Sequence, residues 1–231
     1  YRAPVGESIM WPGSHCPKCN TKLKWYDILP VVSYLFLKGQ CRYCLEKISL
    51  QYPAVEFLNG IIYITIFYKF GFTIPSNTAL RFSGLIVISF IDIKEMIIPD
   101  NLVIIILILS VLHKGANYFV YGISQNILNC IGGLLIAGGI FLAIVIVSRG
   151  GMGGGDITLI AALGFVLGIK YILLTIFLSF IFGAIISLLL LLAKIKTLKN
   201  PIPFGPFIIL GFFITVLGGR DLINLYINSI L

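Results

Sequence analysis

Seven long runs of apolar residues dominate the sequence and most constrain how the chain can fold. Polar breaks separate the runs, and most contain glycine, proline, asparagine or lysine, including one at residues 114–117. A helix that crosses a bilayer needs about 20 apolar residues, so the third and fifth runs are short. The sequence therefore predicts an all-α polytopic membrane protein with seven spans. The runs cover residues 53–71, 77–93, 99–113, 126–148, 156–168, 170–194 and 203–220.

Charge is scarce in this chain and unevenly distributed. Of its 231 residues, 58% are hydrophobic and 11% are charged, whereas soluble domains carry about 25% charged residues. This excludes a disordered chain and argues against a soluble enzyme. Residues 1–52 hold seven of the 17 lysines and arginines, so we expect a polar domain over 1–52 and a transmembrane domain over 53–231. The basic residues lie between apolar runs, which predicts a lipid bilayer and no nucleic acid as partner.

The distribution of lysine and arginine also predicts an orientation. If residues 1–52 are cytoplasmic and the runs alternate, twelve basic residues lie inside and five outside. Cytoplasmic loops carry the excess of such residues, so we expect residues 1–52 to face the cytoplasm. The chain begins with Tyr1 rather than methionine. We therefore expect a further segment upstream of this numbering.

Four of the five cysteines form two C-x-x-C pairs, Cys16 with Cys19 and Cys41 with Cys44, separated by 21 residues. Two such pairs at this spacing are typical of a closed, tetrahedral structural zinc site. The alternatives are two disulfides or free thiols, but disulfides are rare in the reducing cytoplasm. We therefore predict that residues 1–52 form a small cytoplasmic zinc-knuckle domain. The fifth cysteine, Cys130, lies in an apolar run and is interpreted as a packing residue.

Acidic residues stand in or beside the apolar runs, where ionisable groups are costly and therefore candidates for function. Asp100 and Asp156 each precede an apolar run and could cap a helix, and Glu56 could be an interfacial residue. Asp92 is flanked by apolar residues and has no evident capping role. In the topology above, Asp92 and Asp156 both lie at cytoplasmic ends of runs and could meet.

Five glycines fall within residues 150–155, directly before Asp156. Such a segment permits very close backbone approach, which suits a loop that holds a substrate peptide against the acid; a flexible hinge is the alternative. Two carboxylates a few ångströms apart share a proton, so one can activate water while the other polarises a peptide carbonyl. The pattern predicts aspartic proteolysis by Asp92 and Asp156, with Gly153 and Gly155 in the substrate loop.

Taken together, these motifs resemble the bacterial type IV prepilin peptidases, which are polytopic aspartic proteases with a Gly-x-Gly-Asp motif. Gly153, Gly155 and Asp156 fill that motif, and residues 92–100 resemble the family's first catalytic segment, which ends in Ile-Pro-Asp. Further resemblances cover the N-terminal loop, the zinc knuckles, the segment between them and the start of the next helix, at residues 2–9, 14–19, 41–44, 24–34 and 51–56.

The resemblance implies an enzyme of the bacterial cytoplasmic membrane with eight spans and a cytoplasmic zinc loop. It implies that Asp92 and Asp156 are the catalytic pair and that Asp100 accompanies them without being catalytic. The substrates would be prepilins or pseudopilins, whose leader peptide is cut after a glycine at the cytoplasmic face. Many members also methylate the new N-terminus with S-adenosylmethionine, and Glu56 and Gly60 are the candidates for that activity here.

Two other classes of protein are compatible with parts of the pattern. An ion or proton transporter regulated by a zinc-knuckle loop would use intramembrane carboxylates, but it predicts polar residues spread through the depth of several runs. Here Asp92, Asp100 and Asp156 cluster near one face. A binding scaffold held by zinc knuckles leaves Asp92 and the glycine segment unexplained. The sequence therefore favours a membrane aspartic endopeptidase.

Overall fold

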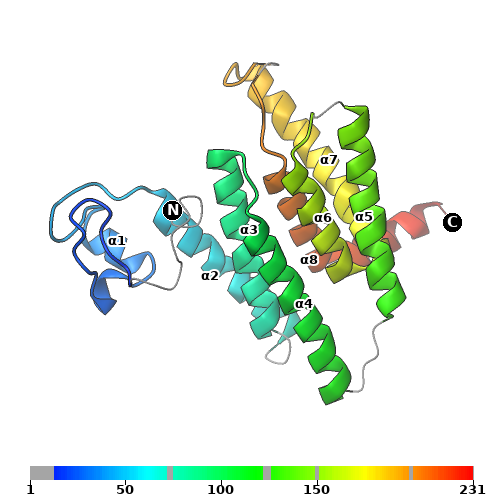
Figure 1. Cartoon of the computed structure of the whole chain (residues 1–231), viewed down its shortest axis with the longest axis horizontal. Helices are drawn as coiled ribbons and strands as arrows, with labels where there is room; N and C mark the ends of the chain where they lie inside the picture. Colours follow the sequence, from blue (N-terminus) through cyan, green and yellow to red (C-terminus); the bar gives the residue numbers. More distant parts are fainter. Residues whose placement is uncertain (1–12, 72–74, 122–125, 149–150, 198–199, 231) are drawn as a thin grey trace. The chain divides into compact units, whose positions relative to one another are not determined.

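A computed structural model describes residues 13–71, 75–121, 126–148, 151–197 and 200–230. Within these ranges the chain is helical and forms two isolated β-bridges but no strand. Seven helices follow the seven apolar runs (Figure 1), which confirms the predicted all-α class. The resemblance at residues 2–9 lies outside the described ranges. The elements are η2 (Trp25–Asp27), α1 (Val32–Phe36), α2 (Gln51–Phe70), α3 (Pro75–Glu95), α4 (Asp100–Tyr121), α5 (Ile127–Val147), α6 (Gly154–Leu167), α7 (Ile169–Leu192) and α8 (Gly205–Ile230).

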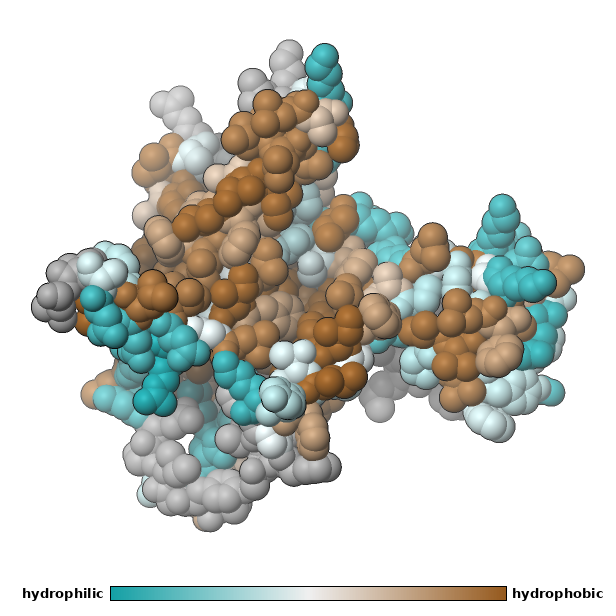
Figure 2. Space-filling model, turned by 180° about the vertical axis from the view of Figure 1, so that it is seen from behind, coloured by the Kyte–Doolittle hydropathy of each residue, from teal (hydrophilic) through white to brown (hydrophobic). Residues whose placement is uncertain are grey.

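The chain divides into two compact units, unit 1 (Tyr1–Pro75) and unit 2 (Ser76–Leu231). Among the described residues, four helices are long and apolar enough to cross a membrane, and all belong to unit 2: α4, α5, α7 and α8. Large apolar side chains lie on their outer surfaces, such as Leu128 and Leu192, which are 78% and 71% exposed. Figure 2 shows broad hydrophobic areas on the helical surface. A surface of this kind suits lipid rather than water.

The predicted break at residues 114–117 is wrong, because α4 runs through it to Tyr121. Its polar side chains find partners in α6 and one turn earlier in α4 itself. The Lys114 ammonium donates to the Val166 carbonyl at 3.3 Å, and the Asn117 amide lies 3.2 Å from the His113 ring nitrogen one turn earlier. The third run therefore forms a helix of 22 residues and is not short.

The fifth run is short as predicted, since α6 has 14 residues. It packs against α4, α5, α7 and α8, and Figure 1 shows it among α5, α7 and α8. The closest approach is to α5, where a Cβ on either Gly133 or Gly164 would overlap the other residue's backbone. Small residues allow membrane helices to pack at such short distances. The short central helix carries Asp156 in its first turn.

Candidate active site and metal centre

Asp92 lies in the last turn of α3, inside the protein, with 5% of its surface exposed. The helix ends soon afterwards because Met96 adopts a positive φ of 55°, while its N–H still donates to the Asp92 carbonyl at 2.9 Å. The chain then turns and buries Ile98 before α4 begins at Asp100. This turn places Ile98 beside both of the other segments that build the site.

A glycine that the sequence analysis missed holds the Asp92 carboxylate. The N–H of Gly205, the first residue of α8, donates to Oδ2 of Asp92 at 2.9 Å. A Cβ on Gly205 would stand 2.6 Å from the same oxygen, so only glycine fits there. The N-terminus of a helix favours a negative charge. The signal was present in the sequence as a Pro-Ile-Pro-Phe-Gly-Pro segment where the last apolar run begins.

Asp156 lies in the first turn of α6 and is 7% exposed. Its N–H donates to the carbonyl of Gly153, the N-cap residue, at 3.2 Å. Oδ1 is buried and has no hydrogen-bond partner among the residues that the structure describes. Asp92 lies close enough to act electrostatically on this carboxyl group. The two carboxyls that the sequence analysis paired are therefore neighbours.

Gly155 allows Ile98 to pack closely against the start of α6. It lies in the first turn of α6, where a Cβ would stand 2.8 Å from Cβ of Ile98. The same Ile98 side chain would be 3.3 Å from a Cβ on Gly205. Ile98 thus packs between the starts of α6 and α8, and both helices approach it at glycines. Gly153, the other member of the motif, would place a Cβ 3.4 Å from Oδ2 of Asp156.

Asp100 occupies the first turn of α4, where an acidic side chain suits the helix dipole. The Thr158 hydroxyl lies 3.4 Å from Oδ1 of Asp100 and 3.0 Å from the Gly155 carbonyl. This contact links the start of α4 to the first turn of α6. Asp100 is exposed, unlike the two buried carboxyls.

The two cysteine pairs of unit 1 form matching hairpins. In each, a β-bridge closes the base, between His15 and Lys22 in one and between Gln40 and Lys47 in the other. The N–H of the first cysteine pairs with the carbonyl five residues later, at 3.1 Å and 2.8 Å respectively. The residue after the second cysteine has a positive φ, 54° at Asn20 and 58° at Leu45. Positions 25 residues apart are therefore structural equivalents.

The four sulfur atoms meet the requirements of a zinc site. They lie within 4.8 Å of one another, and those of Cys16 and Cys44 are 3.8 Å apart. Tetrahedral zinc with bonds of about 2.3 Å holds its sulfurs at about that separation. Each of the four cysteines is a free thiol rather than half of a disulfide. The donor set is closed, and it fits a structural zinc ion.

The pKa values of the thiols also favour a cation between the four sulfur atoms. A hydrogen bond from the Thr21 side chain lowers the pKa of Cys19 to about 6, and backbone N–H groups of the second knuckle lower the pKa of Cys41. At Cys44 the Glu46 N–H favours the thiolate, yet desolvation and the neighbouring sulfurs raise the pKa to about 12. Four thiolates therefore need a cation among them.

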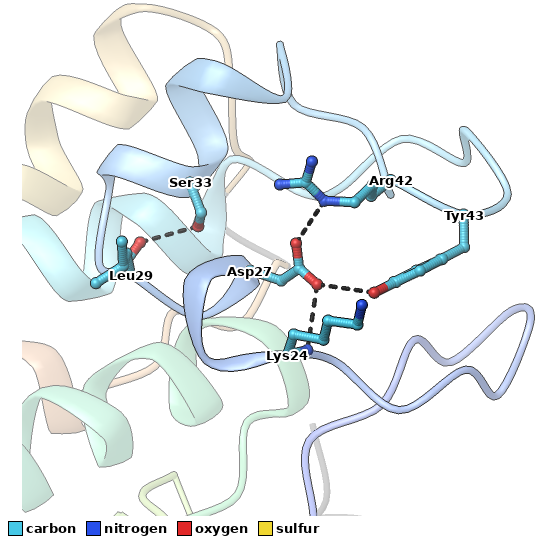
Figure 3. A network of polar contacts seen from close by, with 6 residues as sticks. All are labelled: Lys24, Asp27, Leu29, Ser33, Arg42 and Tyr43. Atoms are coloured by element: carbon cyan, nitrogen blue, oxygen red, sulfur yellow. Dashed lines mark hydrogen bonds and ion pairs between the residues drawn. The ribbon is translucent and has the colours of Figure 1, made fainter.

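A polar network joins the second knuckle to η2 (Figure 3). Its centre is the side chain of Asp27, which is 2% exposed and accepts from Arg42 Nε at 2.7 Å and from the Tyr43 hydroxyl at 3.1 Å. Lys24 N–H completes the network at 3.2 Å. Desolvation opposes the charge on Asp27, but these hydrogen bonds hold the pKa of its carboxyl below the usual value. The network fixes the segment between the knuckles.

Glu56 and Gly60, the residues suggested for methyl transfer, lie one turn apart on α2. Oε2 of Glu56 accepts from the Val31 N–H at 2.8 Å, which ties α2 to the start of α1. A Cβ on Gly60 would meet nothing within 4 Å. Glu56 is thus engaged with Val31, while the space beside Gly60 is open, and the role of both residues in methyl transfer stays a prediction.

Comparison with known proteins supports the same family. Residues 1–70 match the family model described as the bacterial peptidase A24 N-terminal domain, and residues 79–188 match the type IV leader peptidase family. The chain is similar to proteins named prepilin leader peptidase/N-methyltransferase. The Bacillus subtilis protein is 34% identical over 100% of this chain and 91% of its own length. The Xanthomonas campestris protein is 32% identical over 99% and 79%, and the Pseudomonas aeruginosa protein is 32% identical over 96% and 77%.

No solved structure matches the chain significantly. The family models and the relatives agree along almost its entire length, and their names contain both a peptidase and a methyltransferase activity. The apolar helices of unit 2 agree with a multi-pass protein of the inner membrane. The chain therefore belongs to the type IV leader peptidase family of membrane-bound peptidases.

Proposed function

We propose that this chain removes the leader peptide of type IV prepilins or pseudopilins, cutting after a glycine at the cytoplasmic face of the inner membrane. The names of its relatives support the substrate class. The observation that carries the proposal is that two buried carboxyls, Asp92 and Asp156, lie close enough to interact electrostatically. Buried carboxyls of like charge share a proton, and that state suits peptide hydrolysis.

We infer different roles for the two carboxyls from their partners. Asp92 accepts a hydrogen bond from a helix N-terminus, which stabilises a negative charge, so Asp92 is the general base. Oδ1 of Asp156 has no partner among the described residues, which leaves it available to a substrate oxygen. Asp156 is therefore the protonated acid. The role of each residue follows from its hydrogen bonding.

The reaction then proceeds in two stages. Asp92 takes a proton from water, whose oxygen attacks the scissile carbonyl carbon, while Asp156 gives its proton to the carbonyl oxygen. A tetrahedral diol results. Asp92 next passes its proton to the peptide nitrogen as the carbon–nitrogen bond breaks, and Asp156 recovers a proton from a diol hydroxyl. The products are a carboxylic acid and a new amino terminus, and the enzyme returns to its starting state.

We propose that the zinc knuckles lie in the cytoplasm and that Cys16, Cys19, Cys41 and Cys44 hold a structural zinc ion. The metal supplies folding free energy to a unit with few large buried side chains. We further propose that the new amino terminus is methylated, with S-adenosylmethionine supplying an electrophilic methyl group when bound. The names of the relatives support this second activity.

The test is incubation of the purified enzyme with a prepilin and S-adenosylmethionine, followed by measurement of the mass of the product N-terminus. We expect cleavage after a glycine and a methylated N-terminus. Asp92→Asn and Asp156→Asn should each abolish cleavage while the zinc content and the thermal unfolding transition stay unchanged. Full cleavage by either variant would show that the catalytic pair is assigned incorrectly.

A further inference from the structure

Unit 1 exposes an unusual number of large apolar side chains between its two knuckles. Trp25, Leu35 and Phe36 are 74%, 69% and 83% exposed. Figure 2 shows hydrophobic residues of this unit gathered in one area with hydrophilic residues around them. Exposed apolar surface of this kind marks an interaction site. We call the set the apolar segment, and its members are Trp25, Ile28, Leu29, Val32, Leu35 and Phe36.

The polar side chains of the same stretch hold it in this orientation. Asp27 is buried under Arg42 and Tyr43, and the Tyr34 hydroxyl donates to the Ile48 carbonyl at 3.3 Å. The Val31 N–H donates to Glu56 of α2, although Val31 has a positive φ of 59°. A β-branched residue is a true outlier there, so the surroundings must enforce the conformation. Anchored polar groups thus keep the apolar side chains on the outside.

The charge around the apolar segment selects what can cover it. Residues 13–50 contain six lysines and arginines and two acidic residues, a net charge of +4. Lys24 and Lys38 bracket the apolar segment in the sequence. The carboxylate of Asp27 is already paired with Arg42. An apolar surface with a basic border is complementary to the surface of an anionic lipid bilayer.

The apolar segment is tethered to α2, the helix of the first apolar run. Helix α2 begins at Gln51, three residues after Ile48, whose N–H closes the second knuckle on the Gly39 carbonyl at 2.8 Å. Three residues span at most about 10 Å. The sequence predicts that the run at residues 53–71 crosses the bilayer, and this would put the knuckles at the membrane surface. Tryptophan and tyrosine side chains favour that interface.

We propose that the apolar segment of unit 1 docks into the interfacial layer of the membrane, at an anionic phospholipid surface. Interfacial segments lie about 5–10 Å within the headgroup and acyl boundary. The zinc-knuckle unit is then a peripheral membrane-binding module as well as a domain of the chain. This inference does not depend on the roles proposed for Asp92 and Asp156.

Tryptophan fluorescence of the whole protein tests the proposal. The chain has two tryptophans, so Trp11→Phe leaves Trp25 as the single reporter. The protein is reconstituted into vesicles of phosphatidylcholine and phosphatidylglycerol, with bromine either near the headgroups or near the chain ends. We expect stronger quenching by the shallow bromine, a blue-shifted emission and weak quenching by aqueous acrylamide. Removing phosphatidylglycerol should weaken the bromine quenching.

Matched variants and two contrary outcomes complete the test. Leu35→Gln with Phe36→Gln should reduce bromine quenching of Trp25. Leu45→Gln, at a leucine 68% exposed in the second knuckle, should leave it unchanged. Strong acrylamide quenching without bromine quenching would mean that the segment faces water. Quenching by neither agent would mean that protein covers it. Either result, or equal quenching without phosphatidylglycerol, would overturn the assignment to an anionic lipid surface.

Discussion

Replacing Gly205 with alanine tests how the active site holds its base. The added Cβ would stand 2.6 Å from Oδ2 of Asp92, 3.2 Å from its Cγ and 3.3 Å from Cδ1 of Ile98. The contact with Oδ2 is closer than such atoms can approach, and Ile98 blocks escape on one side. Asp92 must therefore move, or α8 must begin further away. Either response lengthens the 2.9 Å hydrogen bond from the Gly205 N–H.

The size of the effect follows from the bond that is lost. A hydrogen bond to a charged group contributes about 1.5–3 kcal/mol. One factor of ten in rate corresponds to about 1.4 kcal/mol, so we expect kcat for leader cleavage to fall about 10- to 100-fold. KM should change little, because Gly205 holds the side chain proposed as general base and is not expected to contact the substrate. A split between kcat and KM distinguishes this from general disruption.

The assay is steady-state cleavage of a prepilin by enzyme in detergent or vesicles, with product measured by mass. The matched control is Gly218→Ala on the same helix, where a Cβ would meet nothing within 4 Å. Thermal unfolding and zinc content of both variants report whether the protein is intact. Unchanged kcat for Gly205→Ala would refute the positioning role. An equal loss in Gly218→Ala would show that the effect belongs to α8 as a whole.

Three further perturbations address packing, charge and metal. Gly133→Ala should lower the free energy of unfolding by about 1–3 kcal/mol through overpacking against α6. Gly139→Ala should not lower it, because a Cβ there would meet nothing within 4 Å. Denaturation followed by circular dichroism measures both free energies. The lowered pKa of Asp27 means that its ionised carboxylate stabilises unit 1 above the unfolded pKa of about 3.9, and that this stabilisation is lost as the pH falls. Asp27→Asn should remove this pH dependence, which a protease-protection assay measures. Chelation should make residues 13–50 protease-sensitive, and if they stay protected without metal the structural role of zinc is wrong.

The sequence was sufficient for features that depend on local composition. Apolar runs predict the helices because only a helix satisfies its own backbone in lipid. Two C-x-x-C pairs predict a four-sulfur cluster because knuckle geometry is local to each pair. The meeting of Asp92 and Asp156 followed from topology, since both stand at ends of runs on one side. The cysteine cluster and the neighbouring carboxyls are present in the structure.

Features that depend on distant partners were not predictable in this way. The sequence predicted a break at residues 114–117 because their polar side chains have no evident partner nearby. The Lys114 ammonium in fact donates to the carbonyl of Val166, 52 residues away. Gly205 was not singled out within the run at residues 203–220, because its contact with Asp92 spans 113 residues. Glu56 read as a methyltransferase candidate, yet it also holds the Val31 N–H. A single sequence shows the chemistry of such residues but not their neighbours.

The zinc ion proposed for the paired knuckles would also act as a cross-link in the chain. Zinc held by four cysteines joins residues 16–19 to residues 41–44 and so closes the 21-residue loop between them. Closing a loop of that length removes about 3 kcal/mol of chain entropy from the unfolded state, by analogy with a disulfide. That loop carries the exposed apolar side chains and the buried Asp27. Loss of one metal ion would therefore free the entire loop, so metal supply to the cell would decide whether unit 1 keeps its shape.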